Sequence, residues 1–325
     1  MGTQTIRRTL FVSMLLLFSQ AFAQNWPSRP VRIISPTGPG LSADLVGRVL
    51  ADKLSRQIGQ QFYVDNIAGA ATIVGAQAAA RAAPDGYTLL IATAGTLANN
   101  PLIYKSLPYD PDRDFVPIAF VGDSSSFLIA VNNDLPARTL TQLIALEKAK
   151  PSSLSFAVEV SSGVAAMVGR YLNKQAGINM VEVGYKMGAQ AVQDTMAGRT
   201  QVYLSSIAGL EPFIKAGKLR GIASSAESRP PQLPDIPVIT ETIPGFIITG
   251  FLIMVAPAGT PEPVLQRLNR EVLIAAKEPD LVQKLQTLGF LTNKLGSLQA
   301  TKDILRVEKE RWARIIRELG IKPEL

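Results

Sequence analysis

Residues 31–58 of this chain read VRIISPTGPGLSADLVGRVLADKLSRQI. The apolar β-branched start is typical of a buried strand, and segment 35–40, with its Pro and Gly residues, lets the backbone turn sharply. A helix is expected from Ser42, a good N-cap, because apolar residues recur every fourth position at Val46, Leu50, Leu54 and Ile58. A strand, a glycine-rich loop and a helix N-terminus in this order expose backbone N–H groups. Exposed N–H groups at a helix N-terminus favour the binding of an anion, either phosphate or carboxylate.

The first 23 residues have the pattern of a cleaved export signal. Arg7 and Arg8 precede the apolar segment Leu10 to Phe18, which is too short to cross a bilayer, and Ala21-Phe22-Ala23 is a typical cleavage site. We therefore predict that residues 1–23 are a signal peptide and that the exported protein begins at Gln24. Loss of the two Arg residues lowers the net charge from +7 to +5.

The composition excludes several kinds of chemistry. The chain has no Cys and no His, which excludes disulfides, thiolate nucleophiles, Cys or His metal sites and Ser-His-Asp triads. The basic residues are scattered, which argues against nucleic acid as a partner. The longest later apolar run, Phe246 to Ala256, contains Gly250 and is followed by Pro257, so it predicts a buried strand rather than a membrane span. We expect no metal, no cofactor and no catalytic activity.

Strands and helices alternate along the chain in two series. The first has predicted strands at 31–34, 61–64 and 88–92, with helices at 42–58 and 73–83. The second has strands at 154–160, 180–183, 201–204 and 219–223, with helices at 164–176, 189–197 and 210–216. Strands at 115–121 and 127–131 and a helix opened by Thr139 and Gln142 separate the series, and helices at 264–277, 281–288 and 298–319 end the chain.

This alternation predicts an α/β protein with two lobes, each a mostly parallel sheet flanked by helices. We expect residues 24–125 to begin the first lobe, residues 126–245 to form the second, and residues 246–325 to return to the first with the C-terminal helices.

Three loops that follow predicted strands carry small residues with hydroxyl groups. They are Thr37 to Ser42, Thr93 to Thr96, and Ser161-Ser162-Gly163. In a parallel sheet such loops share the carboxyl edge, where ligands bind at the crevice between halves. Backbone N–H groups and hydroxyls can hold a carboxylate there without Arg. The candidate ligand-binding residues are Thr37, Gly38, Gly40, Ser42, Thr93, Gly95, Thr96, Ser161, Ser162 and Gly163.

Other interpretations remain open at this point. Gly38 to Ala43 spells G-x-G-x-x-A, and Asp65 ends the next strand, as in a dinucleotide-dependent oxidoreductase. Pro39 stiffens this loop and argues against that interpretation. A hydrolase with paired carboxylates is a second alternative, although no acid pair has a recognisable spacing. Each hydroxyl taken singly also fits a helix cap.

Several motifs, taken together and in order, make the chain resemble a known family. They are Trp26-Pro27-Ser28-Arg29-Pro30, Pro84-Asp85-Gly86-Tyr87, Leu107-Pro108-Tyr109-Asp110-Pro111, Leu233-Pro234-Asp235-Ile236-Pro237 and Pro257-Ala258-Gly259-Thr260-Pro261. The chain resembles the solute-binding proteins of the tripartite tricarboxylate transporter family, also called Bug proteins.

The resemblance implies a periplasmic, monomeric binding protein of the two-lobed type. It would close on a small organic acid and pass it to membrane permease subunits, with Tyr185 and Ser205 of the second lobe closing over the far end of the ligand. The alternative is a binding protein that presents its ligand to a membrane sensor instead of a permease.

The chain also departs from the family pattern. Leu41 and Met187 stand where Gly is usual, and Glu159 stands beside the Ser161 loop at a position that is usually small and polar. If Glu159 faces the cleft, it would repel a dicarboxylate and favour a ligand whose distal end is neutral or carries an amine. A solvated rim position for Glu159 is the alternative.

Overall fold

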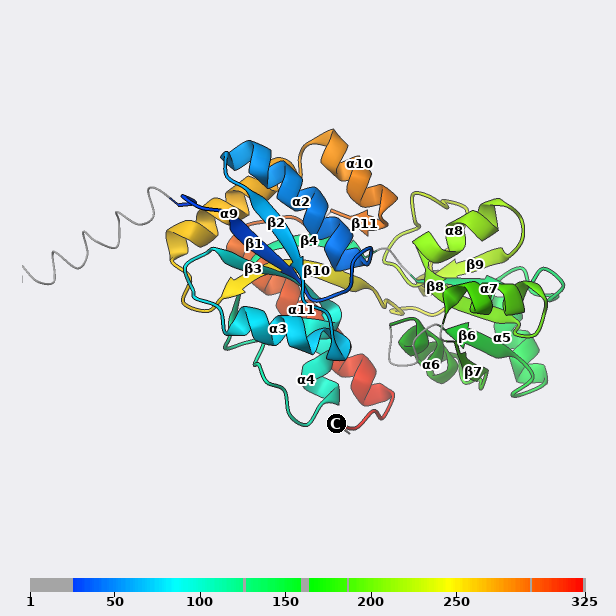
Figure 1. Cartoon of the computed structure of the whole chain (residues 1–325). Helices are drawn as coiled ribbons and strands as arrows, with labels where there is room; N and C mark the ends of the chain where they lie inside the picture. Colours follow the sequence, from blue (N-terminus) through cyan, green and yellow to red (C-terminus); the bar gives the residue numbers. More distant parts are fainter. Residues whose placement is uncertain (1–25, 125–126, 159–163, 186, 293, 324–325) are drawn as a thin grey trace, which may run out of the picture.

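The computed structural model describes residues 26–124, 127–158, 164–185, 187–292 and 294–323. The predicted signal peptide lies outside these residues. The fold has two β-sheets, each covered by helices, that lie side by side (Figure 1). The predicted two-lobed α/β fold class is therefore confirmed.

The first sheet has the strand order β11-β4-β10-β3-β1-β2. Its strands are β1 (Val31–Ser35), β2 (Phe62–Asn66), β3 (Thr88–Thr93), β4 (Phe115–Ser124), β10 (Gly250–Pro257) and β11 (Phe290–Leu291). The second sheet has the order β7-β6-β8-β5-β9. Its strands are β5 (Phe127–Val131), β6 (Ser155–Val158), β7 (Val181–Gly184), β8 (Val202–Ser206) and β9 (Arg220–Ser224). We call each sheet with its helices a lobe.

The strands run antiparallel to their neighbours at the points where the chain passes from one lobe to the other. β1 pairs in parallel with β2 and β3, and β6 pairs in parallel with β7 and β8. β5 and β10 instead run antiparallel to both of their neighbours. These are the strands that first receive the chain from the other sheet, so they enter from the edge that faces the other lobe.

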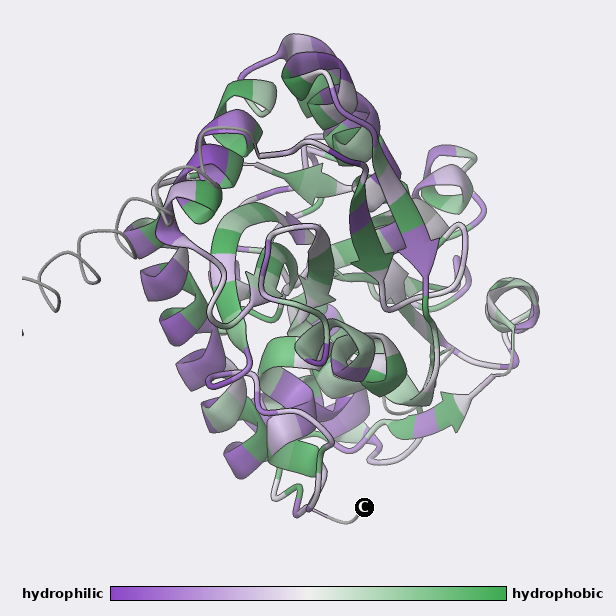
Figure 2. Cartoon of the chain, turned by 60° about the vertical axis from the view of Figure 1, so that its left-hand side comes forward, coloured by the Kyte–Doolittle hydropathy of each residue, from purple (hydrophilic) through white to green (hydrophobic). Residues whose placement is uncertain are grey.

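Helices bury both faces of the first sheet. Successive strand residues point to opposite sides, so each strand contributes side chains to two separate cores. Ile33 packs in one core with α2 (Ser42–Ile58), α9 (Glu262–Ala275) and α10 (Pro279–Thr287). Ile34 packs in another with α3 (Ile73–Ala80) and α11 (Leu298–Glu318). The helices carry hydrophobic colour toward the sheets and hydrophilic colour outward (Figure 2).

The second lobe is layered in the same way. One face of its sheet packs on α7 (Gly188–Met196) and α8 (Ile207–Lys215), and the other on α5 (Leu140–Ala149) and α6 (Val164–Ala176). Thr139 caps α5, since its side chain accepts a hydrogen bond from the Gln142 backbone N–H at 3.2 Å. This is the helix start that the sequence predicts.

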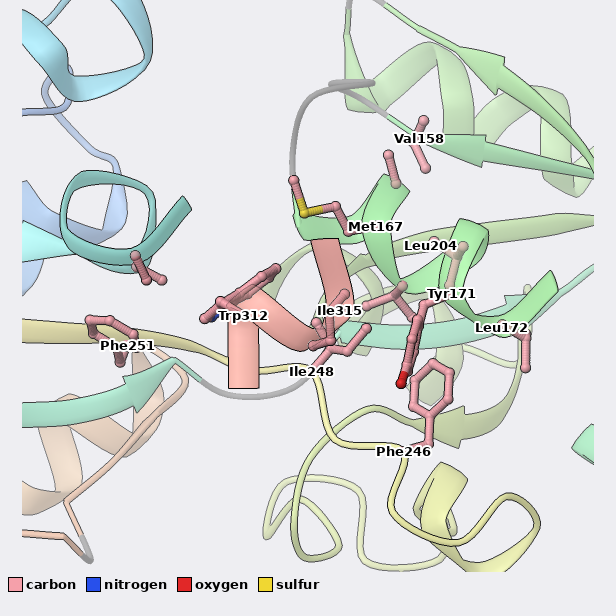
Figure 3. Packing of buried hydrophobic residues seen from close by; sticks show 14 of the residues in the cluster. Val158, Met167, Tyr171, Leu172, Leu204, Phe246, Ile248, Phe251, Trp312 and Ile315 are labelled. Atoms are coloured by element: carbon pink, nitrogen blue, oxygen red, sulfur yellow. The ribbon is translucent and has the colours of Figure 1, made fainter. Parts of the chain in front are cut away.

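The core that contains Ile34 continues from the first lobe into the second. Trp312 and Ile315 of α11 lie between Phe251 of β10 and Tyr171 of α6 (Figure 3). The Tyr171 hydroxyl also donates a hydrogen bond to Glu318 at 3.0 Å. The last helix of the first lobe therefore contacts both lobes.

Some predicted elements differ from the structure. Residues 93–96, expected as a loop, run into the π-helical turn η2 (Gly95–Asn99) and then α4 (Asn100–Ile103). The strand expected from Phe246 begins at Gly250, because residues 246–249 connect the two sheets. α3 ends at Ala80 rather than 83. In the described part of the chain, none of the helices combines the length and the apolar character that crossing a bilayer requires.

Candidate functional site

A cavity of about 330 Å³ lies where the two lobes face each other. From the first lobe it is lined by the loop after β1 and the start of α2, by the turn at Ala71 and Thr72, by the end of β3, by the start of β10, and by η2 and α4. Phe127, at the start of β5, and Val164, at the start of α6, line it from the second lobe. β10 is antiparallel to β3, so Leu252 pairs with Thr93 and its first residues lie at the carboxyl edge of the parallel strands. The cavity thus occupies the edge where a parallel sheet binds ligands.

A larger groove of about 520 Å³ lies elsewhere, between α11 and the start of β4. Its lining includes the ion pairs of Lys309 with Asp112 and Arg306 with Glu310. This groove is at the opposite end of β4 from the crossover between the lobes. In contrast to the smaller cavity, its described lining contains no Ser, Thr, Asn or Gln side chain.

The loop between β1 and α2 is held by one buried carboxylate. Asp44 is 2% exposed and accepts hydrogen bonds from the Gly40 backbone N–H at 2.8 Å and from Asn66 at 2.9 Å, and it pairs with Arg48 at 2.8 Å. Burial raises the pKa of Asp44, but these partners outweigh burial and lower it below its usual value. Gly40 has φ +80°, which favours glycine. The Gly40 N–H is therefore used within the loop, and the loop is preorganised.

A chain of threonine hydroxyls lies behind the second loop. Thr96 Oγ1 contacts Thr93 Oγ1 at 3.1 Å and donates to Thr72 Oγ1 at 2.9 Å. A Cβ at Gly95 would approach Thr93 Oγ1 to 3.2 Å, so glycine keeps this wall open. Thr96 is fully buried beneath the cavity, whereas Thr72, Thr93 and Gly95 line it.

The wall formed by residues 70–72 has a strained backbone. Ala70, Ala71 and Thr72 have φ values of 43°, 51° and 78°, a region that costs L-residues roughly 1–2 kcal/mol each. Asn100 Nδ2 holds this segment through the Ala71 carbonyl at 2.9 Å. Such strain persists only where surrounding contacts maintain it, and here it places Ala71 and Thr72 at the cavity.

Tyr109 holds the η2 turn in place through hydrogen bonds. Its hydroxyl donates to the Thr96 carbonyl at 2.7 Å, and Asn100 Nδ2 lies 3.4 Å from the same hydroxyl. Burial raises the pKa of Tyr109 to about 12, so the hydroxyl stays protonated at neutral pH.

The predicted site residues fall into three groups. Thr37, Ser42, Thr93 and Gly95 come together in the cavity lining. Gly38, Gly40, Thr96, Tyr185 and Ser205 are not part of that lining; Gly40 and Thr96 support it, and the Tyr185 hydroxyl donates to Asp194 at 3.0 Å. Ser161, Ser162 and Gly163, and Glu159 beside them, lie outside the described residues.

Sequence reasoning missed several lining residues. They are Ala71, Thr72, Ala94, Asn99, Asn100, Ile103, Tyr104, Phe127, Val164, Gly250, Phe251 and Leu252. The Asn99-Asn100 pair, one turn after the Thr93 loop, was an available signal. The apolar lining residues gave no such signal, because their sequence pattern is that of ordinary core residues.

The lining can hold an anion without a formal positive charge. All sixteen described lining residues are uncharged, and their polar groups are hydroxyls, carboxamides and loop amides. Within the described ranges, no group of Asp, Glu, His or Cys side chains is placed to hold a metal ion. Hydrogen-bond donors from hydroxyls and backbone amides suit a carboxylate.

Comparison with known proteins identifies the family. Residues 46–321 match the family model described as tripartite tricarboxylate transporter family receptor. The chain belongs to this receptor family. A UPF0065 protein of Bordetella bronchiseptica is 34% identical, covering 98% of this chain and 95% of that protein. Protein BugT of Bordetella pertussis is 30% identical, covering 96% of each. The family predicted from the motifs is confirmed.

Solved structures of similar receptors have the same fold. The R. palustris protein Rpa4515, with adipate, superposes with a TM-score of 0.79 at 28% identity, covering 92% of this chain and 100% of that one. MatC from Rhodopseudomonas palustris, with bound malate, gives 0.73 at 26% identity, covering 90% and 100%.

Proposed function

We propose that this receptor-family chain is an exported, non-catalytic solute-binding protein. It captures a small organic acid in the cavity between its lobes and delivers it to the membrane permease of a tripartite transporter in the periplasm. The observation that carries the proposal is the cavity itself, at which two predicted anion-binding loops meet two residues of the second lobe. Adipate and malate in the related structures support an acid as ligand.

In this proposal the carboxylate lies against Thr37, Ser42, Thr93 and Gly95. The second lobe then closes over the rest of the solute, because its contacts are made only in the closed form. The roles of Tyr185 and Ser205 in closure stay predictions, as do those of Ser161, Ser162 and Gly163.

Isothermal titration calorimetry of the mature protein tests this function. The panel holds mono- and dicarboxylates, each beside its uncharged amide, together with amino acids, aromatic acids and NAD. We expect at least one acid to bind and its amide to bind at least tenfold more weakly. Binding of NAD alone, or of the amides as tightly as the acids, would overturn the proposal.

Ser42 offers a direct test of the carboxylate end. Its side chain is exposed at the first position of α2, so Ser42→Ala removes a hydroxyl from the cavity without unpacking a core. We expect about tenfold weaker binding of the acid, the effect of one hydrogen bond to a charged group. Ser153→Ala is the matched control, because Ser153 is exposed in the second lobe away from the cavity, and it should bind like the wild type.

A further inference from the structure

The two lobes contribute different chemistry to the cavity. The hydroxyls and carboxamides of the lining come from the first lobe, at the end of β3 and on the segments that follow β1, β2 and β3. The described contribution of the second lobe is Phe127 and Val164, two hydrocarbon side chains. Ile103, Phe251 and Leu252 extend the apolar surface in the first lobe. A solute held by its carboxylate in the first lobe therefore meets the hydrocarbon side chains of Phe127 and Val164 on the described part of the second lobe.

A second carboxylate on the solute would find no side-chain hydrogen-bond donor among the lining residues described for the second lobe. The sixteen described lining residues include no Lys, Arg, Asp or Glu. A carboxylate placed against Phe127 and Val164 would lose its water without gaining a side-chain hydrogen-bond donor, and the Phe127 backbone N–H already donates to the Ser225 hydroxyl. A buried charge without hydrogen bonds is costly. An apolar group in the same place gains about 25 cal/mol for each Å² removed from water.

The rim of the cleft continues this apolar character on both lobes. Leu41 precedes the lining residue Ser42 and is 57% exposed. Met187 is 64% exposed and follows β7, whose end pairs in parallel with the end of β6 at Val158. Val164 follows β6, so Met187 lies at the same edge of the second sheet as the cavity.

We infer that the solute is a monocarboxylate with an apolar body, aromatic or aliphatic, and an uncharged distal end. This inference rests on the proposed function and deepens it by naming the ligand class. It separates the chain from its relatives with adipate and malate, which are dicarboxylates.

Calorimetry with matched acids tests the ligand class. Hexanoate and adipate have the same number of carbons and differ in the second carboxylate, and phenylacetate adds an aromatic body. We expect hexanoate or phenylacetate to bind at least tenfold more tightly than adipate. Adipate binding as tightly as both monocarboxylates overturns the inference and leaves the proposed function standing. Phenylacetamide binding as tightly as phenylacetate overturns the proposed function. Failure of both monocarboxylates to bind at millimolar concentration also overturns the inference.

Two variants test whether the preference for a monocarboxylate over adipate arises from the cavity and its rim. Val164→Thr replaces a methyl with a hydroxyl of the same shape, and it should weaken hexanoate binding about threefold to tenfold and narrow its advantage over adipate. Val181→Thr is the control, because Val181 lies in the same lobe on β7, is 48% exposed and does not line the cavity. Met187→Gly removes an exposed rim side chain and should weaken phenylacetate about twofold to fivefold. Unchanged binding in both Val164→Thr and Met187→Gly, with wild-type unfolding curves, contradicts the inference.

Discussion

Asp44 shows how a single residue shapes the site without lining it. It is buried, and its three partners come from the loop, from β2 and from the next turn of α2. Its lowered pKa means that the folded state stabilises the ionised form. This contribution is complete above the ordinary carboxyl pKa of 3.8 and is lost as the pH falls through the lowered folded value.

We therefore predict that Asp44→Asn lowers the free energy of unfolding by about 1–3 kcal/mol at neutral pH, because a charged acceptor of buried hydrogen bonds is lost. Urea unfolding should show this deficit at about pH 7 and a smaller one at about pH 3, which is below the ordinary carboxyl pKa, so that the wild type has begun to lose the same stabilisation. Asp52→Asn on the same helix is the control, since that side chain is 58% exposed, and it should change stability by less than about 0.5 kcal/mol. An equal deficit for Asp44→Asn at both pH values would contradict the role of its charge.

Helix α11 carries Glu308 and Arg311, two of the five members of a partly buried ion cluster beside the crossover between the lobes. Lys294, just before the helix, contacts Asp123 at 2.9 Å, Glu227 at 3.3 Å and Glu308 at 3.6 Å, and Arg311 contacts both Glu residues. Burial raises the pKa of Asp123 and Glu308 despite these cations. Burial opposes the ionisation of Glu227 too, but Lys294 and Arg311 outweigh it and lower its pKa. The acids outweigh burial at Lys294 and raise its pKa.

We predict that Lys294→Met destabilises the protein by about 3–5 kcal/mol at neutral pH, because three acids are left with one cation. The deficit should shrink toward about pH 4. Asp123 and Glu308 have folded pKa values above their unfolded ones, so they take up protons first and then need no cation. Thermal unfolding across this pH range measures the deficit.

Lys53→Met is the matched control for this prediction. Lys53 is 18% exposed, close to the 20% of Lys294, but its partners Glu278 and Asp280 are about half exposed. Pairs with exposed partners contribute about 0–1 kcal/mol. Equal losses of stability in Lys294→Met and Lys53→Met would show that burial of the acidic partners does not determine how much each lysine stabilises the protein.

Elements with a local signal were predictable from the sequence, and elements that depend on distant contacts were not. The apolar spacing from Val46 to Ile58 predicted the course of α2, and Gly59 ends it with φ +77°. Ser42, predicted as the N-cap, is instead the first helical residue, because Leu41 occupies the cap position. The η2 turn was missed, because its small residues are held by Tyr109 and Thr72, which are distant in the sequence. The ion cluster had no local signal either, since its members extend from residue 123 to residue 311.

The same reasoning explains the partial prediction of the site. Thr37, Ser42, Thr93 and Gly95 follow strands, and strand ends can be located from hydrophobic patterns. Phe127 and Val164 reach the cavity only because the two lobes face each other. No pattern within either lobe specifies that arrangement.

At the scale of the whole molecule, Ser225 joins the two connections between the lobes. Its backbone N–H donates to the Phe127 carbonyl at 3.0 Å, and its hydroxyl donates to the Ile248 carbonyl at 2.6 Å. The Phe127 N–H in turn donates to the Ser225 hydroxyl at 3.1 Å. Residues of both crossovers are therefore bound to one buried side chain, close to the lining residue Phe127.

The continuous core predicts that the two lobes unfold together. Trp312 is 1% exposed and packs in the cluster that contains residues of both sheets, whereas Trp26 is 3% exposed and packs only on the other face of the first sheet. In urea, unfolding followed by far-UV circular dichroism and by tryptophan fluorescence should coincide in the wild type. Trp312→Ala and Trp26→Ala should each lower the free energy of unfolding by about 3–5 kcal/mol.

Only Trp312→Ala should also lower the dependence of that free energy on urea. Loss of the contact between the lobes lets one lobe unfold before the other, so less surface is exposed in each transition and the slope falls. Trp26→Ala leaves the shared core intact and should keep the wild-type slope. A wild-type slope in Trp312→Ala would mean that the crossovers held by Ser225, rather than the packing of α11, couple the lobes.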